Sequence, residues 1–142
     1  MEIAIYTDGG SLNNPGPAAS AFLIYKGKDK TGELVYKEGK AIGVATNNVA
    51  EYTALVNALT KLHELIKSGD LEKPAKVTVI SDSELMVKQI NGLYKVKHAD
   101  MRDLLFQVRI CEGDLNLPIV YTNVLRDKNA DADALVKQAL GR

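Results

Sequence analysis

Apolar and polar positions change their spacing once along the chain, and this change divides the predicted elements into two groups. Before residue 46, apolar residues alternate with polar ones or fill short runs between turn residues, which is typical of β-strands. Strands are expected at 3–8, 19–25 and 34–44, and the short turns between them favour an antiparallel meander. From Tyr52 to Ile66 the apolar residues recur every three or four positions, which predicts an amphipathic helix. Asn47 or Asn48 is expected to cap its start.

The second half alternates short strands with helices. Strands are predicted at 119–125 and at 77–80, a continuous apolar run typical of a strand buried on both faces. Helices are expected at 83–90, around 101–108 and at 130–140. A strand that returns through a helix runs parallel to its predecessor. The order βββ-α-β-α-α-β-α therefore predicts an α/β fold with a mixed five-stranded sheet flanked by helices.

Composition is that of an ordinary globular protein. Of the 142 residues 46% are hydrophobic and 25% charged, so disorder is not expected, and the length suits a single domain over 1–142. We find no signal peptide, and no apolar run approaches the ~20 residues that cross a bilayer. The single cysteine, Cys111, excludes an intrachain disulfide and a multi-cysteine zinc site. We expect a cytoplasmic monomer without membrane contact.

Charge is balanced overall, with 18 basic and 18 acidic residues, and this balance by itself argues against a nucleic-acid partner. Its distribution is less even. The stretch 85–99 contains no acidic residue but includes Lys88, Lys95, Lys97 and His98. This pattern is typical either of a solvated helix face or of a local basic patch.

Four acidic residues stand out by position: Asp8, Glu51, Asp82 and Asp133. Asp8 and Asp82 are expected to close the first and fourth strands, at the ends where ligand sites collect in α/β sheets. Each acid also has a local structural interpretation. Asp8 could open a turn, Glu51 could favour the first turn of the long helix, Asp82 could cap the next helix, and Asp133 could be solvated. These local roles do not explain why two acids end core strands.

If the four carboxylates converge, their repulsion raises their pKa values and lowers stability. Divalent cations relieve that repulsion, and oxygen ligands without Cys or His suit Mg²⁺ or Mn²⁺ rather than zinc. An all-carboxylate cluster that holds two such ions suits phosphoryl chemistry, in which one ion activates water and the other stabilises the leaving oxygen. Gly9 and Gly10, directly after Asp8, would allow a ligand to approach the backbone closely.

Four motifs resemble those of type 1 ribonuclease H, and they follow that family's order along nearly the whole chain. They are Tyr6-Thr7-Asp8-Gly9-Gly10-Ser11 with Asn14-Pro15-Gly16-Pro17, then Thr46-Asn47-Asn48-Val49-Ala50-Glu51-Tyr52, then Ser81-Asp82-Ser83, and finally Asn129 with Ala132-Asp133 and Leu135. The resemblance implies the ribonuclease H-like fold. It also implies hydrolysis of the RNA strand of RNA–DNA hybrids with two Mg²⁺ or Mn²⁺ ions, leaving a 5′-phosphate and a 3′-hydroxyl.

The resemblance also implies roles for individual residues. Asp8 would bridge both ions, Glu51 and Asp82 would complete the site of one, and Asp133 would serve the other. The amide side chains of the asparagines both donate and accept hydrogen bonds, as contact with a 2′-hydroxyl of the RNA requires. Other residues would contact phosphates of the DNA strand. The residues implied to contact the hybrid are Asn14, Thr46, Asn47, Asn48, Tyr94, Lys97 and His98.

The chain departs from the family pattern in two places. The stretch Tyr121–Asn129 lacks the histidine that many members carry on a mobile loop, and it resembles a shorter-loop branch with an arginine there. Arg126 is the candidate for that auxiliary role, and a surface arginine is the alternative. The chain has no Trp and lacks the basic protrusion of longer members, and Tyr94–His98 stands in its place. His98, where the family often has Asn, is otherwise an exposed loop residue.

Other functions stay open as alternatives. Some members of the shorter-loop branch also cut duplex RNA, so the duplex specificity could be broader. An inactive hybrid-binding module would not need all four acids. An actin-like ATPase, suggested by Asp8-Gly9-Gly10-Ser11, needs two such domains. An integrase or resolvase is disfavoured by Asn47 and Asn48, since DNA alone has no 2′-hydroxyl to contact.

The last helix offers two acids, Asp131 and Asp133. They are two residues apart, or about 200° around a helix, and therefore cannot both face one site. The apolar stripe of that helix lies between them and does not choose. The resemblance favours Asp133, because the family's acid follows an Ala and precedes a Leu by two positions.

Overall fold

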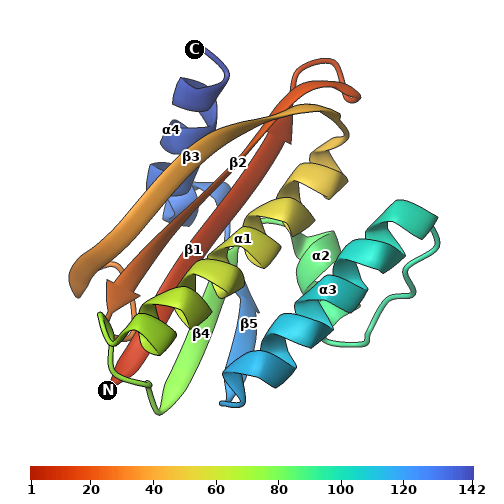
Figure 1. The fold of residues 1–142 in the computed structure, drawn as a ribbon. Helices are drawn as coiled ribbons and strands as arrows, with labels where there is room; N and C mark the ends of the chain where they lie inside the picture. Colours follow the sequence, from red (N-terminus) through yellow and green to blue (C-terminus); the bar gives the residue numbers. More distant parts are fainter.

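The computed structural model describes all 142 residues and contains one five-stranded sheet with helices on both faces (Figure 1). The predicted order of strands and helices is confirmed. The elements are β1 (Glu2–Ser11), β2 (Gly16–Lys26), β3 (Glu33–Ala45), α1 (Asn47–Ser68), β4 (Lys76–Ser81), α2 (Glu84–Ile90), α3 (Ala99–Leu115), β5 (Ile119–Asn123), the 3₁₀ turn η1 (Arg126–Asn129) and α4 (Ala130–Ala139).

The strands lie in the order β3-β2-β1-β4-β5. The hairpins make β1, β2 and β3 antiparallel, and the helical crossovers place β4 parallel to β1 and β5 parallel to β4. The register of β1 with β4 ends at the pair Thr7 and Ser81, so the next residues, Asp8 and Asp82, emerge at the same edge.

Asp8 lies within β1 and does not close it, which corrects the sequence prediction. Beyond Thr7 the strand leaves β4 but stays paired with β2 as far as Ser11, and Asp8 itself pairs with Ala21. Asp8 therefore opens no turn. Its carboxyl lies where the two parallel strands separate, on a backbone that β2 still holds.

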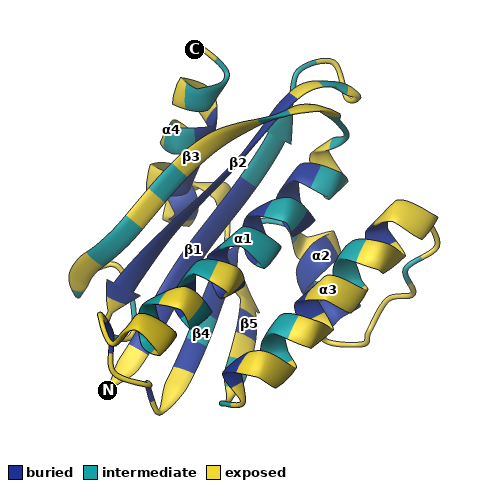
Figure 2. Ribbon diagram, in the orientation of Figure 1, coloured by how far each residue is buried: buried dark blue, intermediate teal, exposed yellow.

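The sheet separates two cores. Helices α1, α2 and α3 cover one face and α4 covers the other (Figure 1). Along β1, Ile3 and Ile5 pack into the larger core with α1, and Ala4 and Tyr6 pack into the smaller core with α4. Figure 2 shows the result, with buried residues along β1 and on the sheet-facing side of α1. The fully buried large side chains of α1 are Tyr52, Leu55, Leu59 and Leu62.

The start of α1 differs from the prediction. Thr46 caps the helix, since its hydroxyl accepts a hydrogen bond from the Val49 amide at 3.2 Å, and Asn47 and Asn48 are its first two residues. Glu51 therefore lies beyond the first turn, which contains no acid. The macrodipole interpretation of Glu51 is weakened accordingly, because that effect fades after the first turn.

Two other element boundaries differ from the sequence prediction. The last strand ends at Asn123, before the predicted Leu125, and η1 follows it. Helix α3 extends beyond 101–108 at both ends, and Cys111 and Leu115 continue its packing face.

Candidate active site

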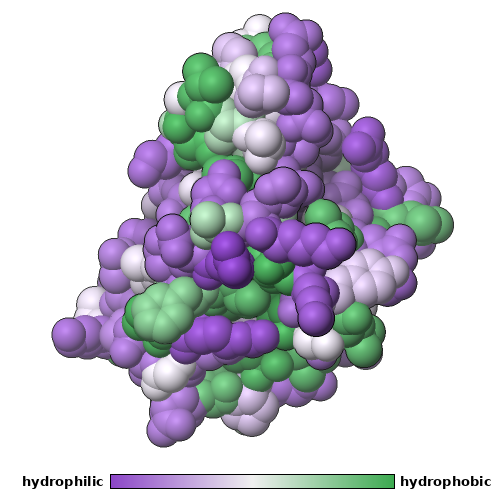
Figure 3. Space-filling model, turned by 90° about the vertical axis from the view of Figure 1, so that its right-hand side faces the viewer, coloured by the Kyte–Doolittle hydropathy of each residue, from purple (hydrophilic) through white to green (hydrophobic).

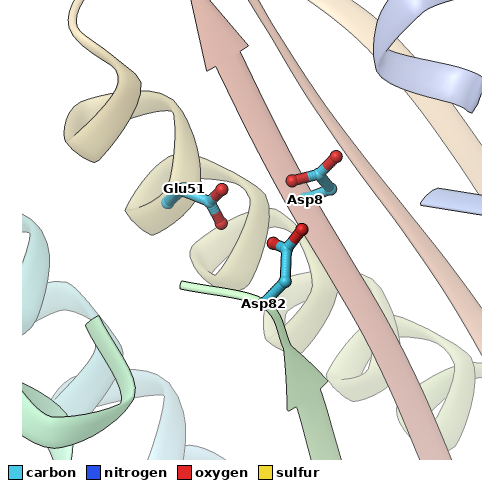
Figure 4. A group of neighbouring side chains, drawn as sticks. All are labelled: Asp8, Glu51 and Asp82. Carbon is cyan, nitrogen blue, oxygen red and sulfur yellow. The ribbon is translucent and has the colours of Figure 1, made fainter. Parts of the chain in front are cut away.

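The separating ends of β1 and β4, together with α1 and α4, line a groove of about 540 Å³. Three acidic side chains meet in this acid groove: Asp8 from β1, Glu51 from α1, and Asp82 directly after β4 (Figure 4). Carboxylate oxygens from the three all lie within 4.8 Å of one another. Asp8 and Glu51 are buried, with 5% and 8% of their surface exposed. The structure thus brings together three of the four acids that the sequence singles out.

Gly9 makes this meeting possible. A Cβ atom at Gly9 would overlap the backbone of Ala50 and Glu51, so any side chain there would push α1 away from β1. The sequence suggested that this glycine lets a ligand approach the backbone. The structure corrects that expectation, because the helix that carries Glu51 fills the space.

Burial and mutual repulsion disfavour the charged forms of two of these acids. Burial, together with the charges of Asp82 and Asp133, raises the pKa of Asp8 to about 7. Burial also raises the pKa of Glu51 well above its usual range, with the charges of Asp8 and Asp82 adding to the effect. The Oε2 atom of Glu51 is buried without a hydrogen-bond partner. A nearby cation would stabilise the charged forms of both.

Asp133 lines the same groove from α4 but lies outside the close group of three. Its Oδ2 atom is 3.0 Å from the Lys137 Nζ atom, one helical turn further on. Asp131 lines a different hollow, with Tyr6 and Tyr25. The helix therefore turns Asp133, and not Asp131, toward the other acids. Asp82 does not cap α2, since Ser83 takes that position.

Arg126 lies at the rim of the acid groove, on η1. Its Nε atom is 3.8 Å from Asp82 Oδ2, and its side chain is 84% exposed. An ion pair so exposed adds little stability, so the guanidinium is free to leave it. Sequence analysis did not single out Lys137, although an Asp–Lys spacing of four residues on a predicted helix is a recognisable signal of such a pair.

Asn47 and Asn48 line the acid groove, whereas Asn14 is not among its lining residues. The Asn14 Oδ1 atom accepts a hydrogen bond from the Asn47 amide at 2.9 Å, and Asn47 Oδ1 accepts one from the Ser11 amide at 2.8 Å. These bonds tie the turn after β1 to the start of α1. Asn14 therefore holds Asn47 in place, and its own contact with a hybrid stays a prediction.

Tyr94, Lys97 and His98 line a second hollow of about 520 Å³, the basic hollow, which α2, the segment after it and the start of α3 form. Asn48 lines both the acid groove and the basic hollow, so the two adjoin. His98 precedes α3, but its side chain makes no capping bond. Figure 3 shows the side of the molecule that carries α3, where hydrophilic side chains cover most of the surface and apolar patches lie between them.

Comparison with known proteins identifies the family. The family model described as RNase H matches residues 1–140. The chain belongs to the RNase H family. The predicted resemblance is thereby confirmed. Separately, none of the chain's helices is both long enough and apolar enough to cross a membrane.

Two curated relatives show how far the likeness extends. A protein of Halobacterium salinarum named ribonuclease HI is 37% identical over 136 residues, which cover 95% of this chain and 62% of that protein. A protein of Mycobacterium tuberculosis named as bifunctional is 36% identical over 140 residues, which cover 99% of this chain and 36% of that protein. The RNase H chain thus spans less than two thirds of either relative.

Solved structures agree with the fold. LC11-RNase H1, solved in complex with an RNA/DNA hybrid, matches with a TM-score of 0.86 at 37% identity and covers 98% of this chain and 96% of its own. RNase H1 of Halobacterium salinarum matches with a TM-score of 0.84 at 33% identity, covering 99% and 98%. The mixed five-stranded sheet with flanking helices is therefore the RNase H fold.

Proposed function

We propose that this chain is an endonuclease that cuts the RNA strand of RNA–DNA hybrids and leaves 5′-phosphate and 3′-hydroxyl ends. The observation that carries the proposal is the meeting of Asp8, Glu51 and Asp82, whose oxygens lie within 4.8 Å of one another in an open groove. Membership of the RNase H family supports it, as does the similarity to a protein solved with an RNA/DNA hybrid.

The donor set fits a hard divalent cation. The three carboxylates offer oxygen ligands without His or Cys, and the unpartnered Glu51 Oε2 atom has its ligand capacity unused. Two Mg²⁺ ions, with Mn²⁺ as the alternative, would be held with Asp8 shared, Glu51 and Asp82 completing one set of ligands and Asp133 serving the other. Ions so held supply activation of the attacking water and stabilisation of the leaving oxygen.

The chain's own residues bind and orient the hybrid. Asn47 and Asn48 present amides beside the acids, where they would contact RNA 2′-hydroxyls together with Asn14. Arg126, which touches Asp82 only through an exposed ion pair, would assist the departure of the product. The residues proposed to contact phosphates of the DNA strand are Thr46, Tyr94, Lys97 and His98.

Cleavage of matched duplexes tests this function. RNA–DNA, RNA–RNA and DNA–DNA duplexes of one sequence are incubated with the protein in Mg²⁺ and in EDTA. We expect rapid cleavage of the RNA strand of the hybrid in Mg²⁺ and none in EDTA. Cleavage of RNA–RNA as well would broaden the specificity, and equal cleavage of DNA–DNA would contradict the proposal. Binding of the hybrid without any cleavage would indicate an inactive binding module.

Three features predicted from the sequence stay predictions. They are the monomeric state, the cytoplasmic location, and the organisation of residues 1–142 as one domain. Sedimentation of the purified protein over a range of concentrations would measure the first.

A further inference from the structure

The segment between α2 and α3, residues 91–98, carries the basic residues of the basic hollow. Its first half is fixed by backbone bonds, since the amides of Leu93 and Tyr94 both donate to the Lys88 carbonyl, at 2.8 Å and 3.3 Å. From Lys95 to His98 no main-chain N–H donates to another part of the chain. The second half of the segment therefore depends on other contacts for its position.

A buried polar pair supplies one of those contacts. The Tyr52 hydroxyl on α1 donates to Gln89 Oε1 on α2 at 2.7 Å, and Gln89 Nε2 donates to the Lys95 carbonyl at 3.3 Å. Tyr52 is 1% exposed and Gln89 5%. The amide of Gln89 thus connects the main core to the backbone of the exposed segment.

The direction of these two bonds is fixed by their chemistry. Burial raises the pKa of Tyr52 to about 12, so its hydroxyl stays protonated and donates at neutral pH. If the Gln89 amide were reversed, its carbonyl oxygen would face the Lys95 carbonyl, and two acceptors would be in contact. Only one orientation satisfies all the groups, and in this orientation Gln89 holds Lys95.

Near the bond from Gln89 to Lys95, one side chain packs against the core and the others face the solvent. Val96 is partly buried and packs against the main core, whereas Lys95, Lys97 and His98 are exposed. The His98 carbonyl accepts a hydrogen bond from the Arg102 amide at 3.0 Å, which ties the end of the segment to α3. Between Tyr94 and His98 the segment is held at the Lys95 carbonyl and the Val96 side chain, and its basic side chains line the basic hollow.

We infer that Gln89 is a positioning residue for hybrid binding. By holding the Lys95 carbonyl, it fixes the phosphate-binding side chains of Lys97 and His98 relative to Asn48 and the acid groove. It acts on the affinity for the hybrid and not on the bond-breaking step, because it touches neither the acids nor the groove that holds them. This inference rests on the proposed function, which supplies the hybrid as substrate.

The decisive variant replaces both members of the pair, as Tyr52→Phe with Gln89→Leu. Removing both polar partners together leaves neither member of the buried pair unsatisfied. The Lys95 carbonyl loses its donor but belongs to an exposed residue, so the melting temperature should stay near that of the parent. The single change Tyr52→Phe is the second variant and keeps the bond to Lys95. Tyr6→Phe is the matched control, since the Tyr6 hydroxyl accepts from the Lys30 amide in the hairpin between β2 and β3.

Two readouts separate positioning from a merely structural role. For the double variant, KM for the hybrid should rise roughly three- to tenfold, about the effect of one hydrogen bond, with kcat unchanged. Trypsin should also cut after Lys95 and Lys97 severalfold faster, with unchanged cleavage after Lys28. Tyr52→Phe should show a smaller rise in KM, and Tyr6→Phe none.

Three results would overturn the inference. The first is an unchanged KM in the double variant, whether or not trypsin cuts faster. The second is a fall in kcat equal to the rise in KM. The third is the same KM change in Tyr6→Phe. A parent protein that cuts no hybrid refutes the proposed function itself, and the trypsin pattern still reports whether Gln89 holds the segment.

Discussion

Two pairs of acids share one groove but lie in opposite surroundings. The inner carboxyls, Asp8 and Glu51, are buried, and neither forms an ion pair with a basic side chain. The outer carboxyls, Asp82 and Asp133, have side chains that are 10% and 27% exposed, and each lies beside a cation, Arg126 at 3.8 Å and Lys137 at 3.0 Å.

This difference favours the inner carboxyls as the proposed cation site. Each outer carboxyl lies beside a basic side chain of the chain itself, whereas the inner carboxyls have no such neighbour, and burial and neighbouring negative charge raise their pKa values. A protein gains nothing for its own stability from such a pair. The inner carboxyls therefore support the proposed cation site, and the outer ones lie beside it in the same groove.

Removal of one inner carboxyl should have the largest effect. We expect Asp8→Asn to lower hybrid cleavage at saturating Mg²⁺ by at least about a hundredfold, because one preorganised electrostatic contact in an active site commonly contributes that much. Single-turnover cleavage measures the loss. Asp114→Asn, an exposed acid on α3, is the matched control and should leave the rate unchanged. Activity of Asp8→Asn within tenfold of the parent would remove the distinction between inner and outer carboxyls.

Substitutions at two neighbouring acids of α4 test the role of the outer pair. Asp133→Asn should lose most of the activity at saturating Mg²⁺, because its carboxyl lines the acid groove. Asp131→Asn should stay within about a few-fold of the parent, since a surface substitution away from the site has little effect. Initial rates over a range of Mg²⁺ concentrations measure both. The reverse order would place α4 in a different register.

The pH dependence of stability distinguishes the inner pair without any substrate. In EDTA, the folded protein holds the Asp8 proton up to about pH 7, whereas the unfolded chain releases it near pH 4, so stability falls as pH rises through this window. Glu51 shifts in the same direction. Urea unfolding should show a decrease on the order of a few kcal/mol between pH 4 and 8 that is smaller in Asp8→Asn. Equal slopes in the two proteins would contradict the assignment.

The smallest expected effect is on the affinity for the hybrid when one exposed positive charge is removed. Lys97→Ala should weaken hybrid binding equally at all sequences and reduce the slope of log affinity against log salt by about one unit, the value for one lost phosphate contact. Titrations in EDTA at several salt concentrations measure the slope. Lys28→Ala, in the hairpin on the other side of the sheet, is the control. An unchanged slope would leave the basic hollow as an ordinary solvated surface.

The elements of the fold were predictable because their apolar spacing is local. The three-residue and four-residue spacing of Tyr52, Leu55, Leu59 and Leu62 predicted α1, and all four are buried. The start of α1 was missed because Asn is on average a better helix cap than Thr, and only the observed bond from the Val49 amide to the Thr46 hydroxyl shows that Thr46 is the cap.

The site was predictable only in part, because convergence is a property of the tertiary structure. Asp8 and Asp82 could be placed at one edge from the parallel strands, but the approach of α1 across Gly9 depends on a contact between distant segments. The packing stripe of α4 could not choose between Asp131 and Asp133. Gln89 gave no signal at all, since a polar residue near the end of a short helix is ordinarily exposed.

Thermal unfolding at pH 8 with and without Mg²⁺ tests most directly whether the inner carboxyls form a cation site. The melting temperature of the parent should rise with Mg²⁺, because a ligand that binds only the folded state stabilises it. In EDTA, Asp8→Asn should melt above the parent, since it removes the repulsion, and its response to Mg²⁺ should be much smaller. A parent unaffected by Mg²⁺, together with a metal-free Asp8→Asn variant that melts well below it, would contradict this account.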